Sequence, residues 1–314
     1  MVSIDCLAAL DHLLWLRTGQ RAAAQLGTTQ PTVSRNTKHC SEVFNIKVAK
    51  TAGEWEVLGD PSLLDAERNV HQRYRWDHQL PLRLDGQYWI DLYLQGFTPP
   101  DWIKGNFNYF SYERPLALIR SGVLDAWICS YPDVPEDHGL TAWQLSRSRI
   151  DLVVKRGHPL LQLGDNLSLN DLVAYPLMPR PEGAFPQLEH MLASVGLGES
   201  PERTARIQAS PWFGKVPIED LTVSISSPLT RNGHGERMVR LPVSLPFEKG
   251  DLLVVRSDFA HHGRTTQLVR ALQDHLRTIA TGQDGFTVLE QPVLHKPAAT
   301  PVHEPQTASL SRVR

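Results

Sequence analysis

The stretch Leu26-Gly27-Thr28-Thr29-Gln30-Pro31-Thr32-Val33-Ser34-Arg35 decides how the N-terminal part of this chain folds. Residues 21–25 before it favour a helix that Gly27 is suited to end, because glycine readily adopts the left-handed backbone found after helix C-termini. Thr29 is suited to cap a second helix, and Pro31 is tolerated in a first turn, where no backbone donor is needed. A helix, a tight turn containing glycine and a second helix form a helix-turn-helix.

The predicted second helix begins with polar side chains suited to the major groove of DNA. In a helix-turn-helix the N-terminal residues of this helix approach the base edges. Glutamine pairs with adenine, arginine pairs with guanine, and hydroxyl groups bind bases or phosphates. The candidate DNA contacts in this helix are Thr29, Gln30, Thr32, Ser34, Arg35 and Lys38. An ordinary helical hairpin with a polar exposed face would show the same local pattern, so the neighbouring sequence has to distinguish the two.

A short β-hairpin is predicted directly after this helix. Apolar and polar residues alternate in 46–50 and in 54–58, on either side of Thr51-Ala52-Gly53. Such a hairpin would be the wing of a winged helix-turn-helix, with Lys50 and Thr51 near its tip as candidate contacts to the DNA backbone. Between residues 28 and 50 four lysine or arginine residues accompany one glutamate. This local positive charge suits DNA, although a solvated helix and hairpin would carry it as well.

The rest of the sequence predicts a linker and a larger α/β domain. We expect a winged helix-turn-helix in residues 1–59, a linker helix in 60–80 that could pair with a second copy, and an α/β domain in 81–284. Strands alternate with helical segments, which predicts α/β layers with parallel sheets. The clearest strands lie at 124–129, 150–155, 206–208, 221–225 and 251–256. Residues 285–314 are rich in proline, threonine, serine and histidine, so we expect a disordered tail.

Composition narrows the class of protein. The 314 residues suffice for two or three domains, and a net charge of -2 gives no basic field over the whole molecule. No apolar run has the length of a membrane span, and the N-terminus lacks the pattern of a signal peptide. The three cysteines have no metal-binding spacing, so we expect a reduced, cytoplasmic protein. Cys40 is interpreted as a small core residue rather than a redox-active thiol.

The motif, the linker and the α/β part, in this order, resemble the LysR-type transcriptional regulators over about residues 3–280. The resemblance is carried by Gln30-Pro31-Thr32-Val33-Ser34-Arg35, Arg120-Ser121-Gly122-Val123-Leu124-Asp125, Leu152-Val153-Val154-Lys155-Arg156-Gly157-His158-Pro159-Leu160 and Asp251-Leu252-Leu253-Val254-Val255-Arg256. It implies a winged helix-turn-helix joined to a regulatory domain built like periplasmic binding proteins, with a small-molecule effector between two α/β lobes. It also implies a homodimer or homotetramer that binds and bends double-stranded promoter DNA. Lobe I would span about 81–149 and 246–284, and lobe II about 150–245.

Four residues are candidate effector contacts in the implied cleft: Gln87, Arg180, Ser226 and Ser227. The loop 178–185 precedes a helix whose N-terminus would favour an anion, so a carboxylate effector near Arg180 is one interpretation. A loop that only caps its helix is the other. Residues 85–89 are bulkier than the family pattern and would crowd the pocket. Thr37 and Cys40 stand where the family usually has large aliphatic residues, which predicts less apolar packing of the recognition helix.

An enzyme and a stand-alone ligand-binding protein are the alternative classes. His261 and His262 are adjacent, so their side chains diverge, and no metal-binding or nucleophile motif accompanies them. We interpret this pair as a solvent-facing turn and expect no metal, no cofactor and no catalytic residue. The N-terminal module argues against a protein that consists of the ligand-binding part alone. The sequence therefore favours a DNA-binding regulator.

Overall fold

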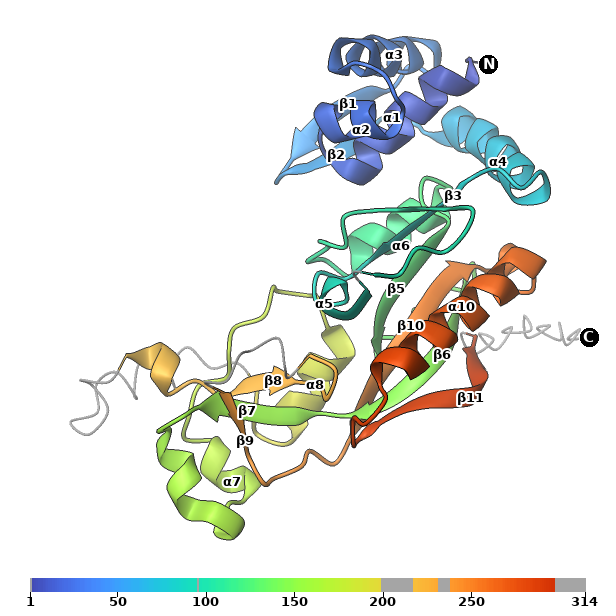
Figure 1. Cartoon of the computed structure of the whole chain (residues 1–314). Helices are drawn as coiled ribbons and strands as arrows, with labels where there is room; N and C mark the ends of the chain where they lie inside the picture. The colour runs from blue at the N-terminus through green and yellow to red at the C-terminus, as the bar shows by residue number, and fades with distance from the viewer. Residues whose placement is uncertain (1, 95, 199–216, 231–237, 297–314) are drawn as a thin grey trace, which may run out of the picture.

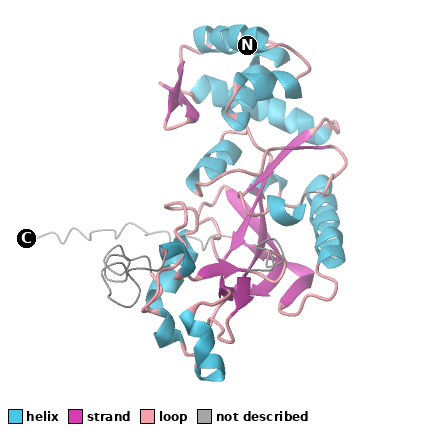
Figure 2. Ribbon diagram, turned by 60° about the vertical axis from the view of Figure 1, so that its left-hand side comes forward, coloured by secondary structure: helices cyan, strands magenta, loops and turns pink. Residues whose placement is uncertain are grey.

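The computed structural model describes residues 2–94, 96–198, 217–230 and 238–296. Figure 1 shows a helical N-terminal domain at one end, the helix α4 beside it, and a two-lobed α/β body below. Figure 2 shows the strands in the centre of the body with helices on both sides. No helix in the described ranges combines the length and the apolar character needed to cross a bilayer.

The N-terminal domain is a winged helix-turn-helix. Its two strands pair antiparallel and form the wing. The elements are α1 (Ile4–Leu16), α2 (Gly19–Gln25), α3 (Gln30–Val43), β1 (Lys47–Thr51) and β2 (Glu54–Leu58). The two helices of the motif and the wing thus form where the sequence predicts them.

The turn between α2 and α3 has the predicted chemistry. Gly27 has a φ of +61°, in the left-handed region. The N–H of Thr28 then reaches back to the carbonyl of Ala23 at 2.9 Å, which closes the end of α2. Thr29 caps α3, because its hydroxyl accepts the N–H of Thr32 at 3.4 Å.

The linker α4 (Ser62–Asp77) buries one face and exposes the other. Its start is supported by Asp60, whose Oδ1 accepts the N–H of Ser62 at 3.0 Å. The buried face carries Leu64, Arg68, Gln72 and Trp76, whereas Leu63, Val70 and Tyr74 are exposed. The predicted linker helix is therefore present, and an apolar row on it remains uncovered within the single chain.

Lobe I is built on a six-stranded sheet with the order β11-β6-β10-β5-β3-β4. The strands are β3 (Leu82–Gly86), β4 (Trp102–Lys104), β5 (Ala126–Tyr131), β6 (Leu140–Arg149), β10 (Glu248–Arg256) and β11 (Phe286–His295). The helices α5 (Asp91–Leu94) and α10 (Gly263–Ile279) pack on one face of this sheet, and α6 (Glu113–Arg120) packs on the other.

Lobe II has a smaller sheet with the order β8-β7-β9. Its elements are β7 (Asp151–Lys155), β8 (Ser224–Ser226), β9 (Met238–Arg240), α7 (Leu169–Leu172) and α8 (Pro186–Ser194), with short 3-10 helices at Pro159–Asn166 and Ile218–Asp220. Only Ile150 separates β6 of lobe I from β7 of lobe II. A second connection returns from β9 to β10, so two chain segments join the lobes.

The expectation of parallel sheets is only partly correct. The strand β3 pairs parallel with β4 and β5, but β10 is antiparallel to β5 and β6, and in lobe II β7 is antiparallel to both β8 and β9. The reason is that β10 enters lobe I from lobe II rather than through a helix lying on the same sheet. The sequence expectation also missed β6, and the predicted strand at 206–208 lies outside the described residues.

The expected disordered tail is wrong for its first part. Residues Phe286–His295 form β11, which pairs antiparallel with β6 and extends the sheet of lobe I. Phe286 and Val288 pack against the core of lobe I, and Gln273 of α10 donates to the carbonyl of Leu289 at 2.6 Å. Phe286 and Val288 lie on the same face of β11, because successive side chains of a strand point to opposite faces. This short alternation did not stand out in the sequence beside the proline-rich residues that follow it. Residues 297–314 lie outside the described part of the chain.

Candidate DNA-contact surface and effector cavity

The helix α3 presents a polar face at the end of the molecule farthest from the lobes (Figure 1). Its buried face consists of Val33, Thr37 and Cys40, which turn toward the domain core. The opposite face is exposed and carries Gln30, Ser34, Arg35 and Lys38. A groove of about 400 Å³ lies between α3 and β1, and Gln30, Ser34, Lys38 and Lys47 line it. The helix face and the wing therefore form one continuous surface.

The other predicted DNA contacts lie at the start of α3, on its exposed face or at the tip of the wing. Thr29 is exposed, and its hydroxyl lies 3.0 Å from that of Thr32, so both take part in the cap of α3. Lys38 is largely exposed and lies 3.7 Å from Glu42 one turn later. Lys50 and Thr51 are exposed at the tip of the wing. None of the eight predicted side chains is buried in the domain core.

The two unusual residues of α3 are part of the core. Cys40 is fully buried, and burial raises the pKa of its thiol to about 12, which disfavours the reactive thiolate. Thr37 is buried as well, and its hydroxyl has no hydrogen-bond partner among the described residues. A buried hydroxyl without a partner costs stability, consistent with our interpretation that this helix packs less favourably than an aliphatic one would.

A cavity of about 210 Å³ lies between the two lobes. Its wall is mostly apolar and aromatic, with few polar groups, as is common in small-molecule sites. Lobe I contributes Tyr88, Trp89, Leu92 and Ser130, lobe II contributes Met178, Pro179, Arg180, Phe185, Leu188, Ile225 and Thr230, and Lys249 comes from the start of β10. The cavity thus touches both lobes and one of the segments that join them.

Lys249 brings a positive charge into this apolar cavity. Its ammonium lies 4.9 Å from the centre of the Trp89 ring, in a cation–π contact. Burial lowers its pKa to about 8, against the attraction of Asp251 and Asp151, which raises it. Asp251 and Asp151 are thus close enough to act on Lys249, although it forms no ion pair within 4 Å with a carboxylate in the described ranges.

Comparison with known families identifies the α/β part. The model of the LysR substrate binding domain matches residues 108–277, which is more than half of the chain. The chain belongs to the LysR family. It is accordingly a transcriptional regulator with an effector-binding domain of two lobes.

Solved structures agree with this fold. A full-length OxyR variant from Pseudomonas aeruginosa is 17% identical, with 90% of this chain and 98% of that chain covered and a TM-score of 0.55. A probable transcriptional regulator from Pseudomonas aeruginosa is 14% identical, with 87% and 97% covered and a TM-score of 0.51. At such low identity the likeness concerns the fold alone. A comparison with curated proteins finds no match.

Only one of the four predicted effector contacts lines the cavity of this LysR regulator. Arg180 lies in its wall. Gln87 is buried between the lobes instead, where its amide donates to the carbonyl of Ala184 at 2.9 Å. Ser226 and Ser227 are buried in a hydroxyl network with Thr230, and of these three Thr230 is the one that reaches the cavity.

The N-terminus of α8 is already occupied by a carboxylate of the protein. Asp133 of lobe I accepts the N–H of Gln187 at 2.7 Å, and its side chain is buried. Burial raises the pKa of Asp133 to about 7, although the N–H groups of Gln187 and Leu188 oppose the rise. Asp133 therefore occupies this helix end in the structure, and the binding of an effector carboxylate near Arg180 stays a prediction.

Lys249 is a cavity residue that sequence reasoning did not assign, whereas Tyr88, Trp89 and Phe185 lie in the segments 85–89 and 178–185 that were expected at the pocket. The expected strand began at Asp251, which left Lys249 outside it. A signal was present in Gly250, because a Cβ at this position would lie 2.1 Å from the carbonyl oxygen of Ser146. Gly250 lies in β10 where the pairing with β6 is irregular, and Lys249 precedes it directly.

The histidine pair is only partly the solvent-facing turn that we expected. His261 is exposed, but His262 caps α10 by accepting the N–H of Arg264 at 3.2 Å and packs edge-on against Trp76. In the described part of the chain no group of three histidine, cysteine or acidic side chains could hold a metal ion.

Proposed function

We propose that this LysR-type regulator binds promoter DNA through α3 and the wing, and that a small anionic effector in the cavity between the lobes changes this binding. The observation that carries the proposal is the exposed polar face of α3 beside the wing, on a chain whose other half belongs to an effector-binding family. We also propose that it works in the cytoplasm, as a regulator that binds DNA.

Substitution of Arg35 tests the DNA contact. Arg35→Ala should weaken binding to the DNA upstream of its own gene by about 1–3 kcal/mol if the side chain reads a base. Gel shift and anisotropy titrations at several salt concentrations measure this loss. The matched control is Arg147→Ala, which removes the same charge from an exposed position on β6 and should leave binding unchanged. Absence of wild-type binding at low salt would contradict the proposal.

The effector is proposed to be a single-ring carboxylate. An apolar cavity of 150 Å³ is known to hold benzene, so about 210 Å³ accommodates one ring with a small charged group. The rings of Tyr88, Trp89 and Phe185 would face the ligand ring, and Lys249 and Arg180 would attract the carboxylate.

Benzoate is a suitable probe for this cavity. At saturating concentration it should raise the melting temperature of the wild type by mass action, and Lys249→Met should remove most of this shift. Lys155→Met is the matched control, because Lys155 lies at the end of β7 in an ion pair with Asp220. Benzamide separates shape from charge, and an equal shift with benzamide would refute the proposed anion contact.

The assembly is proposed to be a homodimer or a homotetramer formed through α4. Leu63, Val70 and Tyr74 are 72%, 68% and 49% exposed and lie on one side of this helix. A row of exposed apolar side chains on a long helix is suited to pairing with a second copy. Light scattering on the full chain would give its mass, and a monomer would contradict this part of the proposal.

A further inference from the structure

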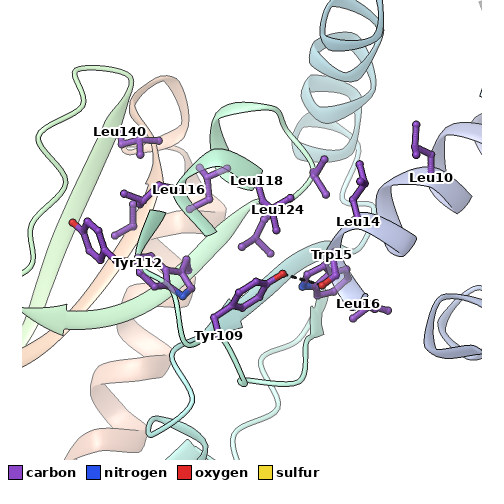
Figure 3. Packing of buried hydrophobic residues seen from close by; sticks show 14 of the residues in the cluster. Leu10, Leu14, Trp15, Leu16, Tyr109, Tyr112, Leu116, Leu118, Leu124 and Leu140 are labelled. Atoms are coloured by element: carbon purple, nitrogen blue, oxygen red, sulfur yellow. Dashed lines mark hydrogen bonds between the residues drawn. The ribbon is translucent and has the colours of Figure 1, made fainter. Parts of the chain in front are cut away.

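The DNA-binding domain is docked on lobe I within the same chain. The indole N–H of Trp15, at the end of α1, donates to Oδ2 of Asp85 at 2.7 Å, and the hydroxyl of Tyr109 donates to the carbonyl of Trp15 at 2.8 Å. Figure 3 shows Leu10, Leu14, Trp15 and Leu16 of α1 in one apolar cluster with lobe I residues, among them Tyr109, Leu116 and Leu124.

Asp85 is set in a pocket formed for its carboxylate. It is 1% exposed, and besides the indole it accepts the N–H groups of Gly86 at 2.8 Å and Phe107 at 2.9 Å. Gly105 closes the pocket, since a Cβ at this position would lie 2.1 Å from Oδ2 of Asp85. The contact to Trp15 therefore involves a fixed, buried acceptor rather than a surface side chain.

The same segment reaches the effector cavity three residues later, at Tyr88. Gln87 holds the carbonyl of Ala184 in lobe II, next to the cavity residue Phe185. Tyr88 lines the cavity itself, and its N–H donates to the carbonyl of Tyr109 at 3.2 Å. Residues 85–88 and Tyr109 thus contact α1 on one side and the cavity on the other.

The helix α1 also carries the recognition helix. Leu13 of α1 packs with Val33 of α3, and Cys40 of α3 belongs to the same apolar cluster as Leu10 and Leu14. A displacement of α1 would therefore move α3 with it, because packed side chains transmit displacement.

We propose that the Trp15–Asp85 contact couples the effector cavity to the DNA-binding domain of the same protomer. A ligand that moves Gln87 and Tyr88 displaces Asp85, and the displacement passes through Trp15 to α1 and α3. The inference rests on the proposed function, since it needs α3 to bind DNA and the cavity to bind an effector. A ligand acts in this way only if its affinity differs between the protein before and after this displacement.

A double-mutant cycle on the full-length protein tests the coupling without an effector. Gln87→Leu breaks the bond to lobe II without altering a residue of α1 or α3. Asp85→Asn keeps an oxygen for the N–H groups of Gly86 and Phe107 but turns an amide donor toward the indole. With a duplex selected from a random pool, Gln87→Leu should change the Kd about threefold or more in the wild-type background and by less than about 1.5-fold with Asp85→Asn.

Gln273→Leu is the matched control for this cycle. Gln273 is equally buried and also donates its amide to a backbone carbonyl, that of Leu289, but it lies on α10 away from both interfaces. Its substitution should leave the Kd unchanged in both backgrounds. If the Asp85→Asn variant does not fold, Trp15→Phe takes its place in the cycle, because it removes the same hydrogen bond.

Hydrogen exchange separates this inference from the proposed function. Gln87→Leu should speed amide exchange in residues 10–16 and 105–109, and Gln273→Leu should not. Wild-type protein that binds no duplex would refute the proposed function, and unchanged exchange in these segments would still refute the coupling. Equal effects of Gln87→Leu in both backgrounds, or no effect in either, would also overturn it.

Discussion

Lobe I has two interfaces within the chain, and they differ in what holds them. Toward the winged helix-turn-helix it uses buried charges: Asp11 of α1 lies 2.8 Å from Arg68 of α4 and 3.1 Å from Arg83 of β3. Toward lobe II it uses isolated hydrogen bonds around a cavity, such as those from Gln87 to Ala184 and from Gln187 to Asp133.

The difference indicates which interface moves. Buried charges are costly to separate, because each would lose its partner in a medium of low dielectric constant. A few hydrogen bonds beside an apolar cavity are exchanged for water at lower cost. Lobe I should therefore stay with the DNA-binding domain and rotate against lobe II, so that ligand-induced closure reorients the DNA-binding end as one unit.

The largest effect should come from breaking the buried ion cluster. Burial alone would raise the pKa of Asp11, but Arg68 and Arg83 together hold it below its ordinary value. Asp11→Asn removes the anion from the buried guanidinium of Arg83 and leaves Arg68 with the more exposed Asp65 alone, so it should lower the free energy of unfolding by about 3–5 kcal/mol. Urea denaturation measures this change.

Asp65→Asn is the control for this prediction. Asp65 also contacts Arg68, at 3.2 Å, but its side chain is 38% exposed. Its substitution should cost less than about 1 kcal/mol, as is usual for exposed pairs. Equal losses from Asp11→Asn and Asp65→Asn would show that the interface does not depend on buried charge.

Tryptophan-to-phenylalanine substitutions at the two interfaces should lower the free energy of unfolding by less than Asp11→Asn does. Trp15→Phe removes a hydrogen bond to the carboxylate of Asp85 and should cost about 1.5–3 kcal/mol, because bonds to charged groups are the stronger ones. Trp89→Phe removes a bond of 3.1 Å to the neutral amide of Gln87 and should cost about 1 kcal/mol. Thermal and urea unfolding of the two variants give the comparison, and a reversed order would contradict it.

The elements of the DNA-binding end were predictable from the sequence because their signals are local. Gly27, Thr29 and Pro31 define a turn and a cap within five residues, and the wing strands alternate around a short turn. The strands β6 and β11 were not predictable in this way. Their pairing depends on partners far away in the sequence, and no local pattern encodes the order of strands in a sheet.

The cavity was predictable in place but not in composition. The family resemblance located it between the lobes, and residues 85–89 and 178–185 do border it. Which side chains face inward depends on the angle between the lobes, so Gln87 turned out to join the lobes whereas Lys249 reaches the cavity. A single buried carboxylate, Asp133, also occupies the N-terminus of α8.

The smallest effect concerns the pH dependence of the weaker interface. Burial raises the pKa of Asp133 to about 7, above that of an unfolded aspartate, so the folded chain binds more protons between about pH 4 and 7. Stability should therefore fall as the pH rises through this window. Asp133→Asn keeps an acceptor for the N–H of Gln187 but does not titrate, so this loss between pH 5 and 8 should be absent from its profile. Asp165→Asn, at an exposed position, should leave the profile unchanged, and parallel profiles for the wild type and Asp133→Asn would show that this carboxyl does not titrate at the lobe interface.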